Sequence, residues 1–109
     1  MMANIEDVND SNFEQIVLNS QMPVVVDFWA QWCGPCRKLT PVLEQIQNEF
    51  IDSIKVVKID ADKNVNIAKE YGVFSLPSVL IFKDKEVKEV MVGMMPKSAI
   101  VSNIKQLLN

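Results

Sequence analysis

The sequence of 109 residues contains no histidine and only two cysteines. A Cys–His nucleophile pair is therefore impossible, and a structural zinc site, which usually takes four Cys or His ligands, would need a second chain. The net charge is −3 and no basic run occurs, so nucleic acids and anionic membranes are poor candidates as partners. No apolar run approaches the length of a membrane span. The first seven residues lack the basic and apolar regions of a signal peptide, and we expect a cytoplasmic protein without a bound metal.

The composition is that of an ordinary globular protein, with 49% apolar and 23% charged residues. A chain of this length is long enough for one domain and too short for two. There is no internal repeat, linker or low-complexity segment. We therefore expect a single domain over residues 1–109.

Strand and helix patterns alternate along the first three quarters of the chain. Strands are expected at residues 5–8, 24–29 and 54–59, the second of them apolar without alternation, as in a strand that is covered on both faces. A capping box at Ser11–Glu14 predicts the first helix, with Phe13, Ile16 and Val17 inward. The second helix follows Cys36, contains Pro41 and buries Leu39, Val42, Leu43, Ile46 and Phe50. The third buries Val65, Ala68 and Tyr71, and ends at Gly72 in a left-handed conformation.

The last quarter of the chain predicts a hairpin and a final helix. Strands at residues 78–82 and 87–92 are joined by a tight Asp84-Lys85 turn, so they should pair in antiparallel fashion. Pro96 is expected at the first helical position, ahead of a helix that buries Ile100, Val101, Ile104, Leu107 and Leu108. The resulting βαβαβαββα order predicts an α/β fold, with a mixed sheet between helices on both faces.

Both cysteines lie in one motif, Trp32-Cys33-Gly34-Pro35-Cys36, between the strand at residues 24–29 and the following helix. The spacing alone fits a redox pair, half of a shared metal site or a structural disulfide. The position at a helix start favours the redox pair, because unpaired N–H groups and the helix dipole stabilise a thiolate there. Cys33, at the turn, is the expected nucleophile, and Cys36, one turn deeper, the expected resolving thiol.

Asp27 interrupts the most apolar strand of the sequence. Burial there is costly for a carboxylate and should raise its pKa. Asp27 is thus a candidate to take the proton of Cys36, although a purely structural aspartate, paired with the backbone or with Lys58, is the alternative. Lys58 shares strand parity with Ile54 and Val56, so it is expected to point inward and to tune Asp27.

With Val-Asp-Phe-Trp-Ala before the cysteine motif, Leu76-Pro77 about forty residues beyond it and Val92-Gly93 later, the chain resembles the thioredoxin family over nearly its whole length. The resemblance implies a five-stranded mixed sheet flanked by four helices, and a thiol–disulfide oxidoreductase that reduces disulfides in proteins. It also implies that Asp27 accepts the proton of Cys36. Gly34-Pro35 between the thiols accompanies a reducing function in the family; Pro35 also preorganises the first helical turn.

The resemblance further implies a peptide-docking groove beside the cysteines. Pro77 would be cis and face the disulfide, and Leu76 would offer its backbone to a bound peptide. The other groove residues would be Trp32, Phe74, Gly93 and Met94. For Trp32, simple packing is the alternative, and Met91 is expected to be flexible core filler.

The chain departs from the commoner family pattern away from the thiols. Phe74-Ser75, Ser78, Asp84-Lys85, Met94 and Pro96 replace the usual residues. These differences leave the redox chemistry intact and affect the expected choice of target.

No nucleotide-binding glycine pattern is present, so the chain is expected to hold no cofactor and to be re-reduced by an outside donor. By resemblance that donor is thioredoxin reductase, an NADPH-dependent flavoprotein, and the chain is a monomer. Two other classes remain open: an oxidising or isomerising enzyme with the same residues, and a binding module that uses the fold as a rigid scaffold.

Overall fold

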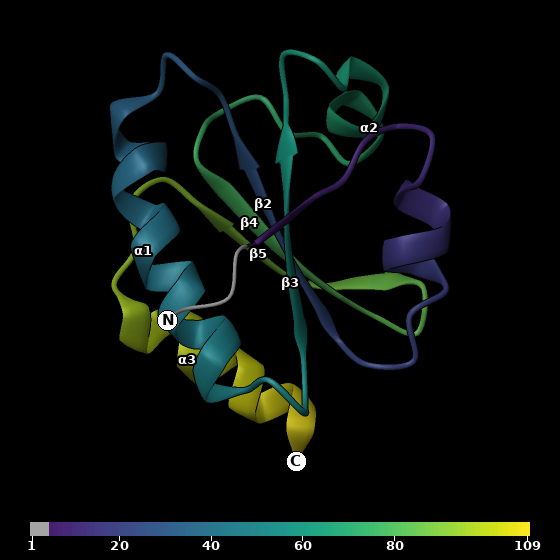
Figure 1. Cartoon of the computed structure of the whole chain (residues 1–109), viewed down its shortest axis with the longest axis vertical. Helices are drawn as coiled ribbons and strands as arrows, with labels where there is room; N and C mark the ends of the chain where they lie inside the picture. Colours follow the sequence, from purple (N-terminus) through teal and green to yellow (C-terminus); the bar gives the residue numbers. More distant parts are fainter. Residues whose placement is uncertain (1–4) are drawn as a thin grey trace.

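The computed structural model describes residues 5–109 and consists of a central sheet between two layers of helices (Figure 1). Its elements are β1 (Glu6–Asp7), the π-helix η1 (Glu14–Leu18), β2 (Val24–Trp29), α1 (Gly34–Glu49), β3 (Lys55–Asp60), α2 (Val65–Glu70), β4 (Ser78–Lys83), β5 (Glu86–Val92) and α3 (Lys97–Leu108). This order and the mixed five-stranded sheet confirm the α/β fold expected from the sequence.

The strands lie in the order β1-β3-β2-β4-β5. β1, β3 and β2 run parallel, and β4 and β5 are antiparallel to their neighbours. β2 is the middle strand, which explains its unbroken apolar run, because neighbours cover it on both edges and helices on both faces. Its predicted bounds, residues 24–29, are confirmed.

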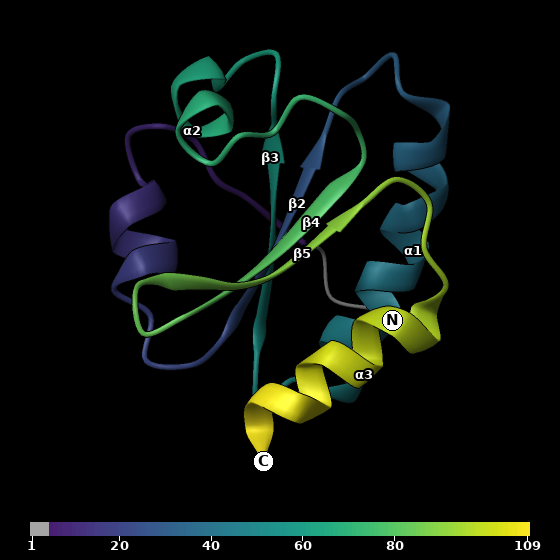
Figure 2. The ribbon, with the colours of Figure 1, turned by 180° about the vertical axis from the view of Figure 1, so that it is seen from behind.

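Two hydrophobic cores lie on opposite faces of the sheet. α1 and α3 cover one face, and η1 and α2 cover the other, as the two opposite views show (Figures 1 and 2). Alternate residues of β2 enter the two cores: Val25 packs with Leu39, Leu43 and Ile104 on the α1 side. Val24, Val26 and Phe28 pack with Phe13 and Val17 on the η1 side. Asp27 and Trp29 therefore belong to the face covered by α1.

The hairpin of β4 and β5 is confirmed, and its turn has the backbone that the sequence requires. Asp84 and Lys85 have φ angles of 54° and 69°, the left-handed pair of a tight hairpin turn. Gly72 ends the segment after α2 with φ 67°, as predicted. The positive φ explains why a glycine occupies this position.

The predicted capping box at Ser11–Glu14 is wrong. Asn9 and Asn12 form the reciprocal pair instead: the Asn9 N–H donates to Asn12 Oδ1 over 2.8 Å, and the Asn12 N–H donates to Asn9 Oδ1 over 3.0 Å. The Ser11 hydroxyl donates to Asn9 Oδ1 and caps nothing. The two asparagines form the same reciprocal pattern as the expected Ser/Glu pair, but two residues earlier, and the donors are the N–H groups of Asn9 and Asn12.

Three smaller expectations about helices are also corrected. Val65, predicted to be inward, is 50% exposed, and Ile67 is buried beside Ala68 in its place. Pro96 caps α3 in an extended conformation, so the helix begins one residue later, at Lys97. Leu108 is exposed at the end of α3, where no element covers it among the described residues.

Candidate active site

The two cysteines form a disulfide at the N-terminus of α1, with 5.3 Å between their Cα atoms. Cys33 is the N-cap residue, in an extended conformation, and its Sγ accepts a hydrogen bond of 3.2 Å from the Cys36 N–H. Pro35 occupies the first turn, where its missing N–H costs nothing. The Cys33 sulfur thus lies where the unpaired N–H groups and the positive end of the helix dipole stabilise negative charge.

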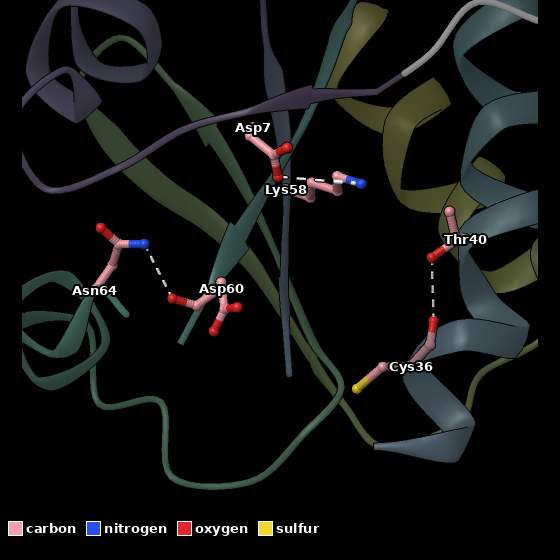
Figure 3. A network of polar contacts seen from close by, with 6 residues as sticks. All are labelled: Asp7, Cys36, Thr40, Lys58, Asp60 and Asn64. Atoms are coloured by element: carbon pink, nitrogen blue, oxygen red, sulfur yellow. Dashed lines mark hydrogen bonds and ion pairs between the residues drawn. The ribbon is translucent and has the colours of Figure 1, made fainter. Parts of the chain in front are cut away.

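The loop from β2 to α1 is held in place by backbone and side-chain hydrogen bonds. The Cys33 N–H donates to the Ala30 carbonyl over 3.1 Å, and the Arg37 guanidinium donates to the Gln31 carbonyl. Behind the disulfide, the Thr40 hydroxyl donates to the Cys36 carbonyl over 3.3 Å (Figure 3). Both cysteines are buried and pack with Ala30; Cys33 is 3% exposed and Cys36 0%.

Asp27 lies on β2, the strand that leads to the cysteines, and is 1% exposed. It pairs in register with Lys58 on β3 and with Val79 on β4. Its Oδ1 atom has no hydrogen-bond partner among the described residues. Burial raises the pKa of Asp27 to about 7, and the positive charge of Lys58 partly offsets this rise. A carboxyl with this pKa can exchange a proton near neutral pH.

Lys58 is half-buried beside Asp27, on the face of β3 that α1 covers. Its Nζ lies 4.0 Å from Asp7 Oδ1 and 5.4 Å from the centre of the Trp29 ring. The ammonium therefore lies between a carboxylate from β1 and an aromatic ring from β2. Among residues 5–109, the ion pair within 4 Å that Lys58 makes is the one with Asp7.

Trp32, which precedes Cys33, and the segment before β4 line one groove next to the cysteines. Trp32 is 69% exposed, and its Nε1 donates to Asp62 Oδ2 over 2.7 Å, so its ring is fixed at the surface and does not pack inside. The Leu76–Pro77 peptide bond is cis. Leu76 packs against the cluster of Ala30, Cys33 and Cys36. Phe74, two residues earlier, is 85% exposed.

A groove of about 580 Å³ runs from this point toward α2. Trp32, Phe74 and Leu76 line it, as do Val65, Ala68 and Lys69. The last three were not among the expected groove residues. The sequence did not identify Val65 as a groove residue, because an apolar side chain at this position fits the buried face of α2 equally well.

Gly93 and Met94 lie beside Pro77 and outside this groove. The Gly93 N–H donates to the Pro77 carbonyl over 2.8 Å, and Gly93 has a φ of 84°. Met94 follows it and is exposed. The expected docking residues thus fall into two groups: Trp32, Phe74 and Leu76 in the groove toward α2, and Gly93 and Met94 after β5, next to Pro77.

Comparison with known proteins identifies the family of the chain. A family model described as Thioredoxin matches residues 4–106. A thioredoxin from Pyropia yezoensis is 46% identical over 96% of this chain and 98% of its own. The chain belongs to the thioredoxin family. A thioredoxin from a Synechocystis species is 41% identical over 98% of this chain and 100% of its own, and a chloroplastic M-type thioredoxin from Chlamydomonas reinhardtii is 45% identical over 94% and 73%.

Membership of the thioredoxin family makes the chain a thiol–disulfide oxidoreductase, with the Cys33–Cys36 disulfide as its redox-active group. In dithiol–disulfide exchange a thiolate attacks a disulfide sulfur and forms a mixed disulfide. Within residues 5–109 no cluster of three His, Cys, Asp or Glu side chains is arranged to hold a metal ion. None of the helices in this part of the chain is long and apolar enough to cross a membrane.

Proposed function

We propose that the chain reduces disulfide bonds in proteins, with Cys33 as nucleophile, Cys36 as resolving thiol and Asp27 as proton acceptor. The observation that carries this assignment is the asymmetry of the pair at α1. Cys33 caps the helix and its sulfur accepts the Cys36 N–H, whereas Cys36 is fully buried within the first turn. A thiolate is therefore stabilised at Cys33, while Cys36 needs a base to remove its proton.

The reaction proceeds in two exchanges that together transfer two electrons. The Cys33 thiolate attacks one sulfur of the target disulfide, which forms a Cys33–target disulfide and releases the other sulfur as a thiolate. Cys36 then gives its proton to Asp27 and attacks Cys33 Sγ. The mixed disulfide breaks, the second target thiolate leaves, and the Cys33–Cys36 disulfide forms. The structure shows this oxidised product.

Asp27 suits the second exchange because burial holds its pKa near neutral pH. A base with a pKa near the working pH is both available in its ionised form and able to accept the proton. Lys58, the register neighbour of Asp27, moderates this effect through its positive charge. Gly34 and Pro35 place the two cysteine residues one helical turn apart, and neither adds a side chain that titrates.

The proposed docking surface for the target consists of Trp32, Phe74 and Leu76, with Gly93 and Met94 next to the buried Pro77. Leu76 touches the disulfide cluster, so a peptide aligned along its backbone would bring its own disulfide to Cys33. Exposed aromatic side chains such as Trp32 and Phe74 supply contact area at little entropic cost.

Re-reduction requires two electrons from outside the chain. By family resemblance we assign them to thioredoxin reductase, an NADPH-dependent flavoprotein. The same proposal makes residues 1–109 a single domain, a monomer, and a cytoplasmic protein, since the cytoplasm keeps thiols reduced. A reconstituted mixture of this chain, NADPH and the reductase should consume NADPH when a protein disulfide is added.

Serine variants of the two cysteines test the assignment of roles. Cys36→Ser should keep the attack by Cys33 and trap targets as a mixed disulfide, which non-reducing electrophoresis detects. Cys33→Ser should trap far less and have no reductase activity. Equal trapping by both variants would refute the assignment of Cys33 as nucleophile.

The direction of the reaction has its own test. The equilibrium potential of the Cys33–Cys36 pair, measured against glutathione, should be strongly reducing. A high potential would make the chain an oxidase or isomerase, and a pair that does not turn over would make it a scaffold.

A further inference from the structure

Three charged residues form one row across three neighbouring strands. Lys58 on β3 is the register partner of Asp7 on β1 and also of Asp27 on β2. In a parallel sheet, partners in register project from the same face, here the face that α1 covers. One ammonium group is thus placed between two carboxylates, one on an outer strand and one on the middle strand.

The two carboxylates differ sharply in their surroundings. The Asp7 side chain is 73% exposed, whereas Asp27 is 1% exposed. The Lys58 ammonium lies 4.0 Å from Asp7 Oδ1, and Figure 3 shows this contact on the sheet opposite Cys36 of α1. Asp27 Oδ1, by contrast, has no hydrogen-bond partner among the residues that the structure describes. The Lys58 ammonium thus makes its ion pair with Asp7, the carboxylate that is already exposed to solvent, and makes none within 4 Å with Asp27 among residues 5–109.

The Lys58 side chain is 27% exposed and borders open space on the side of Asp7. A pocket of about 320 Å³ lies beside it, lined by Asp7, Trp29, Asp60 and Lys63 among others. Asp60 in this pocket already accepts the N–H groups of Asp62 and Lys63. The charged and titratable groups around Lys58 are therefore Asp7 from β1, Asp27 from β2, Asp60 and Lys63 along and after β3, and Cys36 from α1.

We propose that Asp7 is a positioning residue, which draws the Lys58 ammonium toward the edge of the sheet and so keeps it from pairing with Asp27. This role rests on the proposed function of Asp27 as the base for Cys36. An ammonium that paired with Asp27 would favour its ionised form and weaken it as a base. Asp7, on an outer strand and remote from the cysteines in sequence, thereby sets the pH range of the second exchange.

The Asp27 carboxyl can be titrated directly by carbon NMR in the oxidised protein, where the cysteines do not ionise. In Asp7→Asn, Lys58 should turn toward Asp27, and the titration midpoint should fall by about 1 pH unit, the lower end of the effect of an opposite charge within 4–6 Å. Asp7 is exposed, so the variant should fold. Glu6→Gln is the matched control: it removes the same charge from the same strand, but its register partner is Val57, and the midpoint should stay unchanged.

A double-mutant cycle separates the role of Lys58 from the direct repulsion between the two carboxylates. In a Lys58→Met background, Asp7→Asn should no longer move the midpoint. An equal fall in that background would show plain repulsion, and a rise in the Lys58-containing protein would show that Asp7 holds Lys58 near Asp27. Either result overturns the proposed role of Asp7.

The catalytic readout is separate from the titration. If Asp27 is the base, the pH profile for release of target from the mixed disulfide should move with the carboxyl midpoint in Asp7→Asn. A midpoint that falls without any change in this profile would refute the role of Asp27 in Cys36 deprotonation, and with it the catalytic meaning of Asp7, while the Asp7–Lys58 contact would stand.

Discussion

Replacing Asp27 with asparagine should make the protein more stable and a slower catalyst. The pKa of this carboxyl is about 7 in the folded chain, against an ordinary value of 3.8, because burial disfavours its ionised form. A raised pKa means that the folded state binds the proton more tightly than the unfolded state. Its contribution to stability is therefore fully present below about pH 3.8 and is lost as the pH rises to about 7.

The size of the effect follows from the difference between the two pKa values. The difference is about three units, and each unit corresponds to about 1.4 kcal/mol, so ionisation of Asp27 costs about 4 kcal/mol at and above neutral pH. Asparagine has nearly the same shape and carries no charge, so it should recover most of this free energy. Its amide N–H donors will be buried without an assured partner, which offsets about 1–2 kcal/mol of the gain.

Urea unfolding of the oxidised protein at several pH values measures this effect, since the disulfide keeps the thiols from contributing. Relative to the parent chain, Asp27→Asn should be slightly less stable at pH 4, because the cost of the buried amide then exceeds the small cost of ionisation. It should become more stable as the pH rises, and the gain should level off near pH 7 at about 2–3 kcal/mol. Asp60→Asn is a control, because the Asp60 carboxylate accepts two backbone N–H groups, and its loss should give no such gain. A gain that did not vary with pH, or a less stable Asp27→Asn protein at pH 7, would refute the account of Asp27 as a buried, unpaired base.

The remaining predictions concern target choice and local stability. Phe74→Arg and Met94→Ala should change kcat/KM for individual protein disulfides by up to about tenfold, the equivalent of about 1.4 kcal/mol of partial burial, without altering the pH dependence of Cys33 alkylation. A uniform loss with a shifted alkylation profile would contradict this specificity role. Gly72→Ala should lower the free energy of unfolding in urea by about 1 kcal/mol, because alanine is strained at a φ of 67° although its Cβ would meet no atom within 4 Å. Gly34→Ala is the control: it has equal space and no positive φ, so the free energy of unfolding should not fall in this way. Asn9→Ala should cost about 1 kcal/mol, because the N–H groups of Ser11 and Asn12 lose the side-chain oxygen that closes the turn before η1, and Asn9→Ser should restore part of it.

Features that depend on neighbouring residues could be predicted from the sequence. The bounds of β2 and the start of α1 at the cysteines follow from local apolar patterns and from Pro35. The hairpin turn follows from the two charged residues Asp84 and Lys85 between two strand patterns. In each case the information lies within about ten residues, so no knowledge of the fold was needed.

Features that depend on pairing between distant segments could not be predicted. The Asp7–Lys58 contact exists only because β1 pairs with β3 in one register, and a shift by one residue would put Asp7 on the other face. Which residues of α2 line the groove depends on which face of the helix packs against the sheet. Val65 and Ile67 are both apolar, so the sequence does not show which of them is buried. The capping box failed for a different reason: asparagine can form the same reciprocal hydrogen bonds as serine and glutamate, and here Asn9 and Asn12 form them two residues earlier.

The proposed role of Asp27 links the stability of the fold to its chemistry. A base for a buried thiol must itself be buried, and its pKa must lie near the working pH, which an exposed carboxyl with an ordinary pKa does not provide. The middle strand of the sheet meets both requirements, at a cost of about 4 kcal/mol in a fold whose total stability is typically 5–15 kcal/mol. Such a cost is tolerable only where the two cores on either side of β2 are otherwise filled, as they are here by Val24, Val25, Val26 and Phe28. The polar residue that breaks the apolar pattern of the strand is therefore the feature of this sequence, besides the cysteines themselves, that points most directly to catalysis.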